Sequence, residues 1–214
     1  MQFEKPLLVG TMPIATYGLI VLNAVISLFA AQSFKQNRFE YFVFTPYLVS
    51  SHKKGFVGMI LSNFSHADLF HFIFNMYTLH SFGSHLEYLG GTGVFVLIYL
   101  LSTIGSIIAV YISKRKESTY RCLGASGSVS GVLYASIVYA PAGQVLIFGL
   151  LPLSKILYAF LFVGLSIYMA RKAPMGIAHE AHLGGAVTGF ITAALISPAG
   201  LHPFLQSITT LGYI

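Results

Sequence analysis

Two short stretches of the sequence contain the residue types needed for nucleophilic catalysis. Ser126 lies in the small-residue run LGASGSVSGVLY, near the first turn of an apolar helix expected at 125–141. His182 lies in AHLGGAVTG, within a second helix expected at 179–197. A serine hydroxyl is a weak nucleophile until an adjacent base accepts its proton, and histidine is a common base. The pair could therefore supply a nucleophile and its general base, provided that the two helices meet.

Both helices carry small residues at a spacing that favours such a meeting. Gly127 and Gly131 form one GxxxG pattern, and Gly185 and Gly189 form another. In a membrane these faces let two helix backbones approach closely, because no side-chain bulk separates them. We therefore predict that the four glycines support one helix seam, to which the serine and the histidine are both carried.

The composition places this seam inside a lipid bilayer. The chain of 214 residues is 56% hydrophobic and 8% charged, whereas soluble domains carry roughly 25% charged residues. We expect a single membrane domain over residues 1–214, because no Gly-, Ser- or Pro-rich linker divides the chain. The apolar N-terminal run is longer than the roughly 7–15 residues of a cleaved signal core, so we expect a retained first span. Cys122 is the only cysteine, which excludes an internal disulfide.

Six segments approach the length of about 20 mostly apolar residues that a spanning helix requires. We predict an all-α bundle of six transmembrane helices at 14–33, 68–87, 92–113, 125–141, 145–170 and 179–197. The long connection at 34–67 mixes aromatic rings with charges, which predicts short interfacial helices or an ordinary amphipathic loop. The final segment is short and contains Pro203, and we expect it at the membrane surface.

Lysine and arginine are distributed unevenly between the two faces of such a bundle. Ten of the twelve fall in the first, third and fifth connections, and only Lys5 and Lys155 lie on the other side. The positive-inside rule assigns the richer face to the cytoplasm or to a matrix-like compartment. Because these charges are divided among short loops without a compact aromatic patch, we do not expect nucleic-acid binding.

The second helix carries two polar residues on one face. His71 and Asn75 are four residues apart, and polar groups inside a bilayer are costly and usually functional. Both could donate hydrogen bonds toward one point in the bundle, as stabilisation of an oxyanion requires. The alternative is that they tie neighbouring helices together.

Three motifs in this order resemble the rhomboid intramembrane serine proteases. They are HxxxN at His71 to Asn75, GASG at Gly124 to Gly127, and AHxxGxxxG at Ala181 to Gly189. The resemblance covers about residues 14–197.

The resemblance implies a function and a role for each site residue. Ser126 would be the nucleophile and His182 its base, without a third carboxylate, and without a metal or cofactor. The backbone N–H of Ser126, with His71 and Asn75, would hold the oxyanion, and Glu87 would tie the first connection to the second helix. Substrates would be single-span membrane proteins cleaved within the lipid bilayer.

Some positions depart from the family pattern. Ser130 stands where some members have a tyrosine that stacks on the histidine, and the first connection lacks the Trp-Arg pair of many members. The segment RKAPMGIAHE before the sixth helix has the Pro and Gly of a mobile gate or of a plain turn. The resemblance to compact bacterial members implies a bacterial cytoplasmic membrane protein whose site opens outward, against the charge rule. The mitochondrial inner membrane is the alternative.

Two other classes of function fit the sequence less well. HEAH at His179 to His182 is similar to the metalloprotease motif HExxH, but its histidines are three residues apart rather than four. A non-enzymatic relative that binds membrane clients would usually lack the serine or the histidine. The sequence leaves the oligomeric state open.

Overall fold

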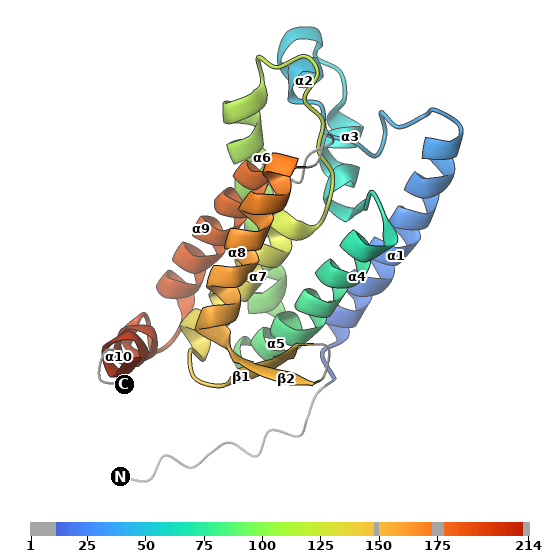
Figure 1. Cartoon of the computed structure of the whole chain (residues 1–214). Helices are drawn as coiled ribbons and strands as arrows, with labels where there is room; N and C mark the ends of the chain where they lie inside the picture. The colour runs from blue at the N-terminus through green and yellow to red at the C-terminus, as the bar shows by residue number, and fades with distance from the viewer. Residues whose placement is uncertain (1–11, 148–149, 173–177, 212–214) are drawn as a thin grey trace.

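The structure is a computed structural model that describes residues 12–147, 150–172 and 178–211. The described chain is mostly helical, and its long helices run side by side in one bundle (Figure 1). The bundle consists of α1 (Ile14–Lys35), α4 (Leu69–Thr78), α5 (Ser84–Gly90), α6 (Thr92–Lys114), α7 (Ser126–Tyr139), α8 (Lys155–Lys172) and α9 (His179–Ile196). A π-helical turn, η2 (Leu79–Gly83), joins α4 to α5, so the predicted second span is one continuous helical segment.

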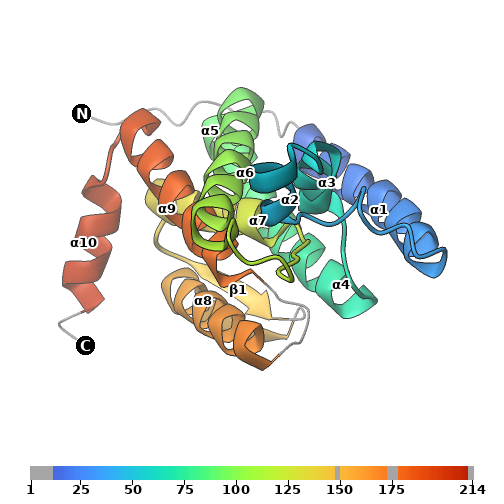
Figure 2. The ribbon, with the colours of Figure 1, turned by 90° about the horizontal axis from the view of Figure 1, so that it is seen from above.

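Helix α7 is the centre of the bundle. Seen from above, it lies among α4, α6, α8 and α9 (Figure 2). Nearly all of its residues are buried, including Val129, Val132 and Leu133 at 0% exposure. A helix that is apolar or small on every side is expected to be buried all round, and α7 carries no charge. The nucleophile candidate therefore starts a helix that is buried on nearly every side.

The first connection folds into short helices that cover the start of α7. It contains α2 (Pro46–His52), α3 (Phe56–Leu61) and a 3₁₀ turn, η1 (Ser62–Phe64). Phe44 and Cys122 form an antiparallel bridge, with N–H to carbonyl distances of 2.8 and 3.1 Å. The N–H of Gly124 donates to the carbonyl of Ser62 at 2.8 Å. These backbone bonds fix the chain just before Ser126.

Glu87 has a structural role, but the partner predicted for it was wrong. Its carboxylate accepts hydrogen bonds from the N–H groups of Ala15 and Thr16 at 3.0 and 2.8 Å. The hydroxyls of Thr16 and Thr92 donate to it as well, each at 2.8 Å. Free N–H groups at a helix start favour a carboxylate. Glu87 therefore binds the start of α1 rather than the first connection.

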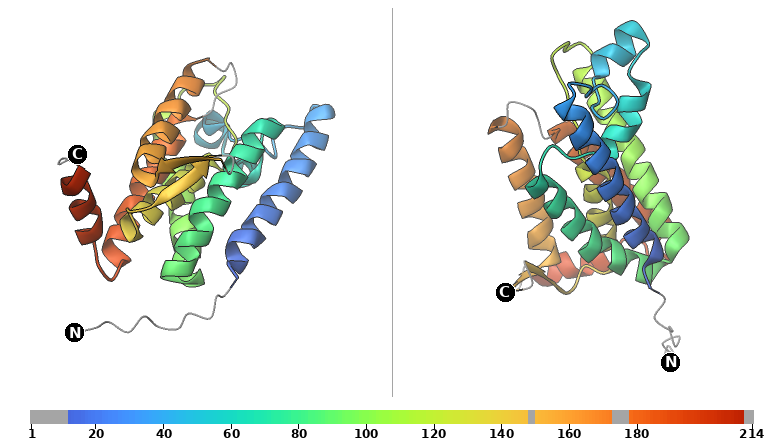
Figure 3. Two further views of the ribbon diagram at one scale, coloured as in Figure 1. Left: turned by 60° about the horizontal axis from the view of Figure 1, so that its bottom comes forward. Right: turned by 90° about the vertical axis from the view of Figure 1, so that its right-hand side faces the viewer.

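The predicted fifth span at 145–170 begins too early. A hairpin of β1 (Gln144–Ile147) and β2 (Leu151–Ser154) occupies its first part, at the end of the bundle opposite α2 (Figure 3). Short apolar runs of this length do not distinguish strand from helix, and Pro152 favours an edge strand. Helix α8 starts only at Lys155.

The C-terminal segment forms a helix despite its proline. α10 (His202–Leu211) carries Pro203 in its first turn, where a missing N–H costs nothing. Of the segment predicted as a gate, residues 173–177 lie outside the described residues. Within the described chain, α1 and α6 are long and apolar enough to cross a bilayer on their own, so the count of six spans stays a prediction.

Candidate active site

Ser126 and His182 meet where α7 and α9 begin. Ser126 is the first residue of α7, and His182 lies in the first turn of α9. The ring Nε2 of His182 is 2.5 Å from Oγ of Ser126, and both residues are buried. This is the hydrogen-bond contact between nucleophile and base that proton transfer requires.

Direct backbone contact between α7 and α9 sets this distance. A Cβ built on Gly185 would overlap the carbonyl of Gly127, and one on Gly189 would lie 2.5 Å from the Cα of Gly131. Ser106 and Ser102 of α6 fill the space beside Gly127 and Gly131, where added Cβ atoms would also lie 3.1 and 2.7 Å from backbone carbonyl oxygens of α9. All four glycines of the predicted seam therefore lie where any side chain would push the helices apart.

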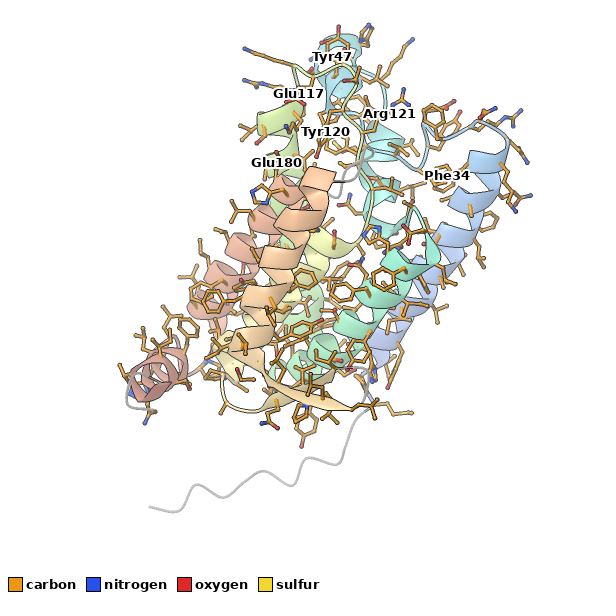
Figure 4. All side chains as sticks on the ribbon, in the orientation of Figure 1. Phe34, Tyr47, Glu117, Tyr120, Arg121 and Glu180 are labelled. Carbon is orange, nitrogen blue, oxygen red and sulfur yellow. The ribbon has the colours of Figure 1, made fainter. Side chains whose placement is uncertain are left out.

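No carboxylate orients the His182 ring in the described part of the chain. Its Nδ1 is buried and has no hydrogen-bond partner there. Glu180, the nearest acid in sequence, instead lies 3.5 Å from Nζ of Lys114 and accepts from the hydroxyl of Tyr120 at 3.5 Å. Figure 4 shows Glu180 and Tyr120 at the same end of the molecule. The geometry is that of a dyad.

His71 lies beside the nucleophile. A Cβ built on Gly124 would lie 2.9 Å from Nε2 of His71 and 3.5 Å from Oγ of Ser126. Gly124 has φ of +131°, so this turn also requires glycine for its backbone. Nε2 of His71 is buried and has no partner among the described residues. A reacting atom near Gly124 would therefore be within reach of both the nucleophile and a hydrogen-bond donor.

Asn75 is buried one turn after His71, but it does not reach Ser126. Its amide nitrogen donates to the carbonyl of His71 at 2.9 Å, within the same helix. Its Oδ1 has no partner among the described residues. No hydrogen bond ties Asn75 to another helix within the described chain, so the structure gives the interhelical-tie alternative no support at this residue.

Residues 53–199 match the family profile of the Rhomboid domain, which is more than half of the chain. The chain belongs to the rhomboid family. It is 32% identical over 189 residues to presenilin-associated rhomboid-like protein, mitochondrial, of Mus musculus, covering 80% of this chain and 46% of that protein. It is 30% identical over 131 residues to rhomboid protease GluP of Bacillus subtilis, covering 61% of this chain and 24% of the relative.

The family assignment confirms the resemblance drawn from the three motifs. Rhomboids are integral membrane proteins, so this chain is one too. RHOMBOID-like protein 12, mitochondrial, of Arabidopsis thaliana is a further relative, 27% identical over 153 residues, with 64% of this chain and 46% of that protein covered. The chain spans about half the length of the mitochondrial relatives that it matches.

A small cavity adjoins the Ser126 side chain of this rhomboid. Its volume is about 20 Å³, and its lining includes Ser62, Asn63, Ser106 and Gly124 as well as Ser126. A water molecule needs roughly 10–15 Å³ of such space and polar partners. The cavity can therefore hold one water beside the nucleophile.

One neighbour of His182 was not predicted from the sequence. The ring of Phe162 on α8 lies against the His182 ring, with 5.9 Å between centroids and 48° between planes. The hydroxyl of Ser130 donates to the carbonyl of Ser126 at 2.6 Å, within its own helix. Phe162 stands in an apolar run, KILYAFLFVG, in which no residue is distinctive. Only the packing of α8 identifies it.

Proposed function

We propose that this rhomboid is an intramembrane serine endopeptidase that cleaves transmembrane segments of single-span membrane proteins. The observation that carries the proposal is the contact of 2.5 Å between His182 Nε2 and Ser126 Oγ, buried in a bundle of membrane helices. The profile match and the relation to a rhomboid protease support the same reaction class. We further propose a single domain with six spans, as predicted from the sequence.

The reaction begins with acylation of the enzyme. Ser126 Oγ attacks the carbonyl carbon of the scissile peptide, and its proton passes to Nε2 of His182. The carbonyl oxygen becomes an oxyanion, which the N–H of Ser126 at the start of α7 and Nε2–H of His71 stabilise. The C–N bond then breaks, His182 returns the proton to the leaving amine, and the acyl group remains on Ser126.

Hydrolysis of the acyl-enzyme completes the cycle. A water at the cavity beside Ser126 gives its proton to His182 and attacks the ester carbonyl. The C–O bond to Ser126 breaks, and the proton returns to the serine. Because a helical substrate has its carbonyl groups hydrogen-bonded internally, it must unwind locally before attack. Substrates with Gly or Pro near the cleaved bond are therefore favoured.

The test is cleavage of a panel of single-span substrates by the full chain purified in detergent. Ser126→Ala and His182→Ala should each abolish cleavage, and the double variant should be scarcely worse than either, because the two residues act as a unit. Ser136→Ala is the matched control, since this serine is buried on α7 and its hydroxyl has no partner among the described residues. Appreciable turnover by Ser126→Ala would refute the proposal. Substrate binding without cleavage by the unmodified chain would favour a client-binding protein.

The oxyanion roles of His71 and Asn75 are tested separately. His71→Ala should lower kcat by about 100-fold with little change in KM, because the charge it meets exists only in the transition state. Asn75→Ala should act in the same direction if its amide turns toward the oxyanion when substrate binds. A loss of thermal stability in proportion to lost activity would instead assign both residues to helix packing.

A further inference from the structure

The end of α6 and the short helix α2 border an open cavity, which is separate from the one beside Ser126. Its volume is about 520 Å³, and it is lined by Tyr47, Ser50, Ser51, Tyr111, Arg115 and Lys116. This volume lies in the range of roughly 300–1,000 Å³ that is usual for sites of small molecules. Figure 4 shows Tyr47 at the end of the molecule that also carries Glu180. None of the lining residues has a part in the catalytic proposal.

Two contacts fix the walls of this cavity. The hydroxyl of Ser50 donates to the carbonyl of Arg115 at 2.9 Å, which ties α2 to the end of α6. The guanidinium of Arg115 lies over the ring of Tyr111, with 6.0 Å between Cζ and the ring centroid. Ser51 is exposed, and its hydroxyl is 3.4 Å from that of Ser50. The cavity therefore combines a supported guanidinium with a hydroxyl group that can donate to a ligand.

The cavity is positively charged. Arg115 and Lys116 are exposed and form no ion pair within the described chain. Glu117, the next residue, is instead 3.0 Å from Nζ of Lys114. The C-terminal end of a helix carries roughly half a negative charge, which the two unpaired cations exceed. A guanidinium, an ammonium and a hydroxyl at one place are the groups that bind a phosphate.

An apolar face of α6 leads directly to this cavity. Its large side chains recur every three or four residues and are 43–63% exposed: Leu97, Leu100, Ile104, Ile108 and Ile112. A continuous exposed apolar face of a membrane protein contacts acyl chains. Arg115 and Lys116 follow Ile112 by three and four residues, so they continue the same face. Tyrosines such as Tyr47 and Tyr111 are typical of the headgroup level of a bilayer. Acyl chains followed by a phosphate are the parts of a phospholipid, in this order.

We propose that the cavity binds the phosphate of an anionic phospholipid, whose acyl chains lie along the exposed face of α6. Arg115 and Lys116 hold the phosphate, and Ser51 donates a hydrogen bond to it. The headgroup must be anionic, because a zwitterionic one would add its own cation to the two of the cavity. The bound lipid bridges α2 and α6, and so stabilises the first connection that covers the start of α7. An acidic protein segment has no acyl chains and would leave the apolar face unexplained.

The test measures lipid binding to the full chain in neutral detergent micelles by native mass spectrometry. Phosphatidylglycerol is compared with phosphatidylcholine of the same acyl chains, and we expect phosphatidylglycerol to bind more tightly. Arg115→Gln and Lys116→Gln should each weaken its binding about 5-fold, and the double variant about 25-fold. Ser51→Ala removes a hydrogen bond without changing the charge, and should weaken binding about 2- to 10-fold.

The matched control removes one lysine and one arginine elsewhere on the same face. Lys35 and Arg38 are exposed, at and just after the end of α1. Figure 4 shows Phe34, the neighbour of Lys35, apart from Tyr47. Lys35→Gln with Arg38→Gln should bind phosphatidylglycerol as tightly as the unmodified chain. The lipid should also raise the unfolding temperature of this control but not that of the double cavity variant, because a ligand that binds only the folded state stabilises it.

Each outcome decides the proposal. Selective binding of phosphatidylglycerol that is lost in the cavity variants and kept in the control supports it. Equal binding of the two lipids, or an equal loss in the control, overturns it, because the attraction is then diffuse. Displacement of the lipid by inorganic phosphate, beyond that by chloride at the same ionic strength, overturns it in favour of a free anion. Binding of a polyglutamate peptide without binding of lipid overturns it in favour of an acidic protein segment. No cleavage is measured, so these results do not depend on the protease proposal.

Discussion

Replacing Gly185 by alanine would place a methyl group where the backbone of α7 already lies. The new carbon would be 2.6 Å from the carbonyl carbon of Gly127 and 3.2 Å from its Cα. Carbon atoms in contact are normally about 3.5–4.0 Å apart, so α7 and α9 must separate by roughly 1 Å. Overpacking of this kind typically costs about 1–3 kcal/mol of folding free energy.

The same displacement acts directly on the dyad. Ser126 is the neighbour of Gly127, and His182 lies one turn before Gly185, so the separation lengthens the contact between Oγ and Nε2. A misplacement of about 1 Å can lower a rate by about 100-fold. We therefore expect a fluorophosphonate probe, which reacts with an activated serine, to label Ser126 of Gly185→Ala about 100-fold more slowly. The unfolding temperature of this variant should also fall. Gly18→Ala is the control, because a Cβ on that helical glycine would meet nothing within 4 Å.

Cys122 supplies the assay for unfolding. It is the only cysteine and 6% exposed, and burial raises the pKa of its thiol to about 12. Because the thiolate is the reactive form, a thiol-reactive dye should label the chain only as it unfolds. If Gly185→Ala unfolds at the unmodified temperature and its Ser126 reacts with the probe at the unmodified rate, the close backbone contact does not set the distance between Ser126 and His182.

Three further predictions address the surroundings of the site. Glu87→Gln should lower the free energy of unfolding by about 2 kcal/mol, measured by thermal unfolding, because the hydrogen bonds to the start of α1 lose their charge. The kcat of the folded protein should stay within a few-fold of the unmodified value. A selective loss of kcat would contradict this structural role. Glu180→Gln should retain cleavage within a few-fold and cost at most about 1 kcal/mol, since its ion pair with Lys114 is partly exposed; abolished cleavage would reveal an orienting carboxylate. Lys116→Cys, in a Cys122→Ser background expressed in bacteria, should react with an impermeant thiol reagent in intact cells if the site opens outward, and labelling only after lysis would follow the charge rule.

Spacing along a single helix was the most informative signal in the sequence. The GxxxG patterns at Gly127 and Gly185 predicted a close seam, and the structure places their backbones in contact there. The run of small and apolar residues in α7 carries no charge, as is typical of a helix buried on every side, and α7 is buried. Such patterns are readable because helix geometry relates each residue to others within a turn or two of it.

Side-chain partners across the bundle were harder to predict. Glu87 was expected to contact the first connection, yet the backbone N–H groups that it binds are more than 70 residues earlier, at Ala15 and Thr16. Phe162 was overlooked because its contact with His182 depends on which helix α8 faces, which its own sequence does not encode. The hairpin at Gln144–Ser154 was read as helix, since hydropathy reports burial in lipid but not backbone conformation.

The carboxylate of Glu87 bears on how the chain is built during synthesis. An acidic side chain left alone within a membrane helix is costly. Helix α1 emerges from the ribosome before α5, so the N–H groups that receive Glu87 are already in place when it enters the bilayer. Newly made α4 and α5 can then dock on a waiting helix. A chain lacking α1 would leave this carboxylate with only the Thr92 hydroxyl among the donors described above, and such a truncated product should be a ready target for membrane quality control.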